Sequence, residues 1–149
     1  MKKVFVLPVM SGASKRAAVP RPSTEPSVEP ANVVTTPAGP VAPGGPEARI
    51  DALEAVLRSA IVGVGPQGTQ AVVAVVEAAG NPGGGRIRPG LAPTGLAAAV
   101  REAALPVPVA AVLITVRVPV DIRHNSKVDR TRLARWADGV LAGGRVRSP

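Results

Sequence analysis

A short stretch near the carboxyl end gathers the side chains that could do chemistry. Residues 118–136, VPVDIRHNSKVDRTRLARW, hold the single histidine, His124, and the single tryptophan, Trp136. Between them lies Lys127, the one lysine outside the amino-terminal tail of a chain that otherwise uses arginine. A lysine on its long stem delivers one compact positive charge, which suits contact with a carboxylate or a phosphate.

The remaining residues offer few other routes to catalysis. The chain has no cysteine, which excludes disulfides and thiolate metal sites. His124 has no cluster of ligands around it, so no metal site is expected, and a hydrogen bond within the turn is favoured over general-base chemistry. The glycine-rich stretches GVGPQG (63–68) and NPGGGR (81–86) lack the features of phosphate-binding loops and are interpreted as turns.

The elements that must position these residues are predicted from hydrophobic periodicity over residues 46–149. Helical spacing covers three segments, which are 46–59, the stretch from Thr94 to Pro106, and 129–144. Short β-branched runs predict strands over 60–64, 70–78 and 109–118, the last with alternating buried and exposed positions. This order predicts an α+β domain with a small sheet of about three strands and helices packed on it.

The first and last predicted helices each carry an apolar stripe that should face the sheet. In the first, the stripe consists of Ile50, Leu53, Val56 and Leu57. In the last, it consists of Leu133, Trp136, Ala137, Val140 and Leu141. Thr94 is expected to cap the middle helix, Asp129 to lie in the first turn of the last helix, and Gly143 to end it.

Residues 1–45 are predicted to form a disordered, proline-rich leader to the domain at 46–149. Proline recurs every few residues from Val19 to Pro46, and it removes backbone donors that regular structure needs. The opening MKKVFVLPVM is similar to a secretory signal, but its apolar run is short, is broken by Pro8 and leads to no convincing cleavage site. A cytoplasmic chain without a transmembrane segment is therefore expected.

The charge of the chain raises the question of a polyanionic partner. Its formal net charge is +8 and its sequence pI is about 11.5. Nucleic acid is nevertheless not expected as a partner, because the chain has one phenylalanine and one tryptophan and lacks aromatic platforms for stacking on bases. A non-catalytic basic interaction module, tethered by the proline-rich leader, stays open as one of two functions.

The other function comes from a family resemblance. Pro119 followed by Lys127, Val128, Asp129 and Arg130 resembles the last motif of the adenylate-forming enzymes, which include acyl-CoA synthetases and fatty-acyl-AMP ligases. In that family a proline-led turn carries a lysine ahead of a closing helix. The string PVDIRHNSKVDRTRLARWA is similar to one branch, which includes the β-lactone synthetases of long-chain olefin biosynthesis, and AIVGVGPQGTQAVVAVVE resembles two strands of the same branch.

The resemblance implies that residues 46–149 are the carboxyl-terminal lid domain of an ATP-dependent acyl-adenylate ligase. It implies ATP with Mg²⁺, and in some members CoA, as cofactors. Lys127 would assist adenylation, and a turn would present it, formed by Asp121, Arg123, His124, Asn125 and Ser126. Arg123 or Arg130 is expected to pair with Asp121 or Asp129.

One part of the family pattern is missing. Nothing in residues 1–48 resembles the large adenylating domain, and Ser126 stands where the wider family usually has glycine. The chain is therefore expected to be a fragment, from a truncated or frame-shifted gene, or a subunit whose large domain is separately encoded and holds the acyl substrate. Alone it is expected to be inactive and not to bind ATP tightly.

Overall fold

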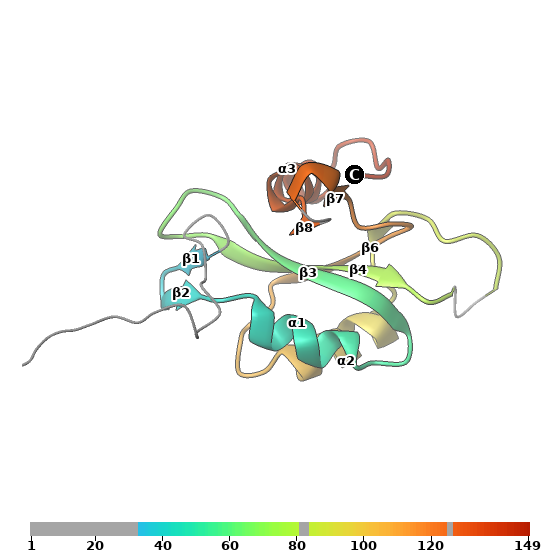
Figure 1. Cartoon of the computed structure of the whole chain (residues 1–149), viewed down its shortest axis with the longest axis horizontal. Helices are drawn as coiled ribbons and strands as arrows, with labels where there is room; N and C mark the ends of the chain where they lie inside the picture. The colour runs from blue at the N-terminus through green and yellow to red at the C-terminus, as the bar shows by residue number, and fades with distance from the viewer. Residues whose placement is uncertain (1–32, 81–83, 125–126) are drawn as a thin grey trace, which may run out of the picture.

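The centre of the molecule is a mixed four-stranded sheet (Figure 1). The computed structural model describes residues 33–80, 84–124 and 127–149. In spatial order the strands are β3 (Val56–Val64), β4 (Ala71–Ala78), β6 (Ala111–Thr115) and β5 (Gly90–Leu91). β4 is antiparallel to β3 and parallel to β6, and β5 is a short antiparallel edge. The predicted α+β class, with three main strands, is confirmed.

Helices cover both faces of this sheet. α1 (Gly44–Asp51) and α2 (Thr94–Ala104) lie on one face, and α3 (Arg130–Leu141) lies on the other (Figure 1). No helix of the described residues is long and apolar enough to cross a membrane. Two apolar clusters form the core, one on each face of the sheet. The α3 cluster consists of Ala60, Val62, Val73, Val75, Leu113, Val118, Leu133 and Ala137.

The alternating burial predicted for the third strand, β6, was wrong, because helices cover both faces of the sheet. The sequence 109–118 predicted alternating burial, but the strand spans only Ala111–Thr115, and Val112, Leu113, Ile114 and Thr115 are all buried. β6 pairs with a neighbour on each side and has a helix layer above and below it. Such a strand needs no polar face.

The first helix is shorter than predicted. α1 ends at Asp51, and Val56 begins β3, paired with Ala78 of β4. Leu57, assigned to the helix stripe, is 63% exposed. The pairing of this strand with β4 satisfies its backbone groups and outweighs the helical propensity of the stretch, because propensity is a weak preference that tertiary contacts override.

The ends of the other two helices partly follow the prediction. α2 begins at Thr94, but Pro93 is its N-cap and no side chain caps it, so the expected cap at Thr94 is wrong. Asp129 is the N-cap of α3 rather than a residue of its first turn, and its carboxylate accepts a hydrogen bond from the Arg132 amide (3.0 Å). Gly143, with φ of +84°, follows the end of α3 as expected.

The glycine-rich segments contain no phosphate-binding loop among the described residues. GVGPQG joins β3 to β4, and two of its glycines have positive φ. Within NPGGGR, residues 81–83 lie outside the described part, and 84–86 precede β5. The turn between β3 and β4 is confirmed, although its first two predicted residues, Gly63 and Val64, end β3.

A further correction concerns the leader. Residues 33–45 are structured, because β1 (Val34–Thr36) and β2 (Gly39–Val41) form an antiparallel hairpin. Val34 is 3% exposed, and Thr35 exchanges hydrogen bonds with Gln70, from its amide to Oε1 and from the Gln70 amide to its carbonyl (both 2.9 Å). The rest of the expected leader, residues 1–32, lies outside the described residues.

This hairpin leads to a prediction about the domain boundary. A chain that begins at Pro46 should be less stable than one that begins at Val33, because it loses the burial of Val34 and the bonds between Thr35 and Gln70. We expect a difference of about 2 kcal/mol in the free energy of unfolding. Urea unfolding followed by circular dichroism measures it. Equal stabilities would show that the hairpin contributes nothing to the domain.

Candidate functional site: a lysine-bearing hairpin

Lys127 lies in a small hairpin on the α3 side of the sheet (Figure 1). Its strands are β7 (Val120–Asp121) and β8 (Lys127–Val128). A short 3-10 helix, Ile122–His124, directly follows β7. They pair Val120 with Val128 and Asp121 with Lys127. The Lys127 side chain is exposed, so its charge is available to a ligand or a partner.

The predicted turn residues are only partly described. Asp121 fixes the start of the turn, because its Oδ1 accepts a hydrogen bond from the Arg123 amide (2.9 Å). The side chain of Arg123 is exposed, beside Ile122, which is 84% exposed. Asn125, Ser126 and the side chain of His124 lie outside the described part, so their predicted roles stay predictions.

The base of the hairpin is tied to the sheet and to itself. Val118, which is buried, donates its amide to Glu77 Oε2 of β4 (2.9 Å). The Asp129 amide donates to the carbonyl of Pro119 (2.9 Å), closing the base next to the start of α3. The exposed lysine therefore extends from a base that is anchored on both sides.

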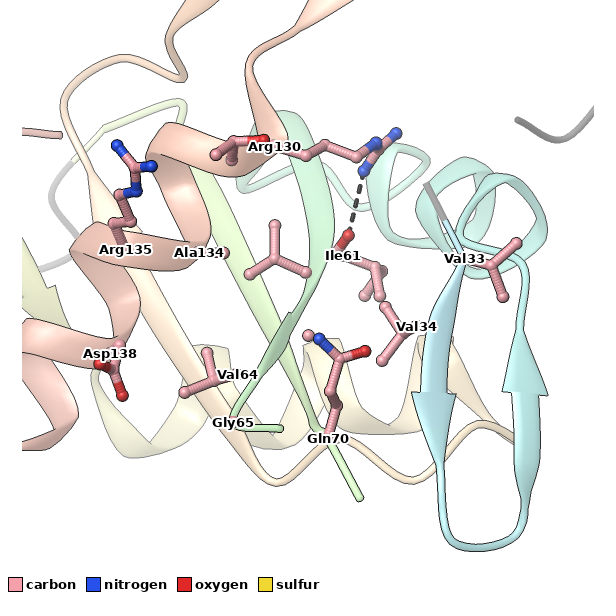
Figure 2. A pocket seen from close by; sticks show the side chains of 13 residues that line it. Val33, Val34, Ile61, Val64, Gly65, Gln70, Arg130, Ala134, Arg135 and Asp138 are labelled. Carbon is pink, nitrogen blue, oxygen red and sulfur yellow. Dashed lines mark hydrogen bonds between the residues drawn. The ribbon is translucent and has the colours of Figure 1, made fainter. Parts of the chain in front are cut away.

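Arg130 does not pair as predicted. Its guanidinium reaches Glu47 of α1, with Nη2 3.1 Å from Oε2 and Nη1 2.5 Å from Oε1. Nη1 also donates to the carbonyl of Ile61 (3.0 Å; Figure 2), and the Ile61 amide donates to Glu47 Oε1 (2.7 Å). The Asp129 carboxylate caps α3, and the predicted pairing of Arg123 with Asp121 or Asp129 stays a prediction.

Sequence reasoning missed Glu47, which stands 83 residues before Arg130. No local pattern connects the two, because only the packing of α1 and α3 on opposite faces of the sheet brings them to the same strand edge (Figure 1). The one available signal was an acidic residue in the first turn of a helix, a common position for helix stabilisation.

Trp136 is not a core residue. It is half-buried beside the α3 cluster, and its indole N–H donates to the carbonyl of Arg147. The buried positions of the helix are Leu133 and Ala137. A tryptophan at the margin of a core can bury its ring while its N–H reaches a backbone acceptor.

A hollow of about 460 Å³ lies between α3, β3 and β1 (Figure 2). Arg130, Arg135 and Asp138 of α3 border it on one side, and Val34 borders it on the other. Lys127 does not line it. The exposed lysine therefore lies outside this hollow.

The positive charge of the domain is concentrated around this hairpin. Residues 117–149 contain eight arginines and lysines against three aspartates, whereas residues 33–116 contain five basic and five acidic residues. The hairpin and α3 both belong to the basic segment and lie on the same side of the sheet (Figure 1). This side can attract anionic groups.

Solved structures share the fold of this chain. Apo MatB from Rhodopseudomonas palustris matches 73% of the chain with 23% identity and a TM-score of 0.53. The amide bond synthetase McbA from Marinactinospora thermotolerans matches 70% with 26% identity and a TM-score of 0.51. An ATP-bound form of the same MatB matches 72% with 22% identity and a TM-score of 0.52. No family model and no curated protein matches the chain.

These likenesses show the fold, and the names of the solved proteins describe an ATP-bound form of MatB and an amide bond synthetase. The match occupies 20% of each of these larger chains. The present chain thus spans about a fifth of their length. The likenesses concern the fold and do not extend to the olefin branch.

Proposed function

We propose that residues 33–149 act as the lid of an ATP-dependent acyl-adenylate ligase, with Lys127 as the residue that assists adenylation. The observation that carries this proposal is the exposed Lys127 on an anchored hairpin, in a fold shared with the carboxyl-terminal part of adenylate-forming enzymes. The order of residues around the lysine supports it independently.

The proposed chemistry explains why an exposed lysine is useful. Adenylation joins a carboxylate to the α-phosphate of ATP and expels pyrophosphate, so two anions must approach each other. A cation on a long stem can contact both groups and stabilise the charge that develops on the phosphoryl oxygens. Lys127 would supply that cation, and the basic side of the domain would favour its approach to ATP with Mg²⁺.

The proposal requires a large adenylating domain. Because residues 33–149 correspond to about a fifth of the length of the solved relatives, the acyl and nucleotide pockets would belong to a large domain outside these residues. Motion of the lid against that domain would deliver Lys127 for adenylation and withdraw it for acyl transfer, to CoA or another acceptor. We further propose a fatty-acyl substrate and the olefin β-lactone branch, supported by the string PVDIRHNSKVDRTRLARWA.

Reconstitution tests this function. The chain is added to an adenylate-forming enzyme truncated to its large domain, and carboxylate-dependent exchange of pyrophosphate into ATP is measured. We expect exchange well above that of the large domain alone, and calorimetry should detect no tight ATP binding by the chain on its own. Exchange that does not rise with any large domain of the family would refute the proposal.

The second candidate function is a non-catalytic basic interaction module. The concentration of positive charge in residues 117–149 favours it. A basic module would bind its partner with an affinity that falls steeply with salt and that depends on several arginines rather than on one lysine. Absence of exchange together with such salt-dependent binding would favour this function over the lid.

A further inference from the structure

The three-way contact among Glu47, Ile61 and Arg130 lies at the open edge of the sheet. β3 is an outer strand, and the amide and carbonyl of Ile61 point away from β4. Glu47 accepts from that amide and Arg130 donates to that carbonyl, while the two side chains also bond each other. A carboxylate, a guanidinium and the backbone amide and carbonyl of one residue thus form a closed cluster, which we call the edge clamp.

The edge clamp joins both helix layers across the strand. Glu47 comes from α1 on one face, and Arg130 is the first residue of α3 on the other (Figure 1). The two side chains are 14% and 21% exposed, so water screens the pair less than it screens a surface ion pair. The planar guanidinium of Arg130 bonds both the Glu47 carboxylate and the Ile61 carbonyl, and these contacts fix the direction of its side chain.

The position of Arg130 connects the clamp to the lysine hairpin. Arg130 follows Asp129, whose amide closes the hairpin base at Pro119, and Lys127 stands three residues before Arg130. Across the hairpin, Val118 is held by Glu77. The clamp therefore fixes the chain where β8 passes into α3, and Glu77 fixes the chain where it enters β7.

We propose that Glu47 is a positioning residue for Lys127, acting through Arg130. This inference rests on the proposed function for the role of the lysine, but the positioning itself is a property of the isolated chain. Loss of the clamp should let the hairpin open and spread the lysine over many orientations. Because misplacement of a catalytic group by about 1 Å can cost on the order of 10² in rate, a remote carboxylate can affect adenylation strongly.

The first experiment uses the full chain alone and measures amide hydrogen exchange by NMR. In Glu47→Gln and in Arg130→Gln, exchange at Val120 and Val128 should rise about tenfold or more, while exchange at Val75 in β4 should change little. Arg49→Gln is the matched control, because Arg49 also donates to backbone carbonyls, those of Ala103 and Ala104, and comes from the same helix as Glu47. Unchanged exchange in the hairpin would overturn the inference, whatever the reconstituted enzyme does.

The second experiment measures pyrophosphate exchange in the reconstituted system. Glu47→Gln should lower kcat roughly tenfold to a hundredfold and leave the KM for ATP nearly unchanged. In a Lys127→Ala background the same substitution should have almost no further effect, because a positioning residue has nothing left to position. If Glu47→Gln lowers kcat by the same factor with and without Lys127, its role is purely structural, and the inference is overturned. Exchange absent even with the unsubstituted chain would refute the proposed function alone.

Discussion

Replacing Lys127 with alanine is expected to lower adenylation by about 10²–10³ in rate, in the presence of a matching large domain. The ammonium group would contact the carboxylate and the α-phosphate only as they approach each other, so its loss removes transition-state stabilisation rather than substrate binding. The same substitution should change the free energy of unfolding by less than about 0.5 kcal/mol, because the side chain is exposed.

Two comparisons make this expectation specific. Transfer from a pre-formed acyl-adenylate should survive in Lys127→Ala, because in the second pose of the lid the lysine would face away from the reacting atoms. Arg132→Ala is the control for charge, since it removes another exposed cation, three residues beyond the helix cap. Pyrophosphate exchange and single-turnover transfer measure the two half-reactions. Equal adenylation by the two variants, or unfolding of Lys127→Ala, would contradict the role of the lysine.

The sequence predicted the parts of the fold that depend on local patterns. β-Branched runs located β3 and β4, and a Gly-rich turn between them was expected from the same stretch. Asp129 and the glycine at 143 placed α3 within a few residues, although Asp129 was expected in the first turn and is the N-cap. The candidate lysine was predicted from the neighbouring residues in the chain; it is exposed, and its role stays a prediction.

The features that the sequence did not predict depend on distant residues or on burial from two sides. The Glu47–Arg130 pair needs α1 and α3 to meet at one strand edge, and nothing near either residue indicates the other. The hairpin at 34–41 was assigned to the leader because it lies among prolines, although Val34 is held by the core and Thr35 by Gln70. Tertiary contacts of this kind outweigh composition.

The stripe on α3 gives the second large effect. Sequence periodicity placed Leu133 and Leu141 on the same buried face, but Leu133 is fully buried whereas Leu141 is 42% exposed. Leu133→Ala should therefore destabilise the chain by about 3 kcal/mol, since it removes buried methyl groups and leaves a cavity between α3 and the sheet. Leu141→Ala should cost less than about 0.5 kcal/mol.

These two leucines form a matched pair, because they undergo the same chemical change on one helix and differ in burial. Urea unfolding monitored by circular dichroism gives both free energies, with m-values that should agree if unfolding is two-state. The helix carries the anchor of the lysine hairpin, so loss of Leu133 should also increase amide exchange along α3 before the sheet is affected. Similar destabilisation by the two substitutions would mean that α3 packs along the whole predicted stripe, and a larger effect at Leu141 would reverse the assignment of its buried face.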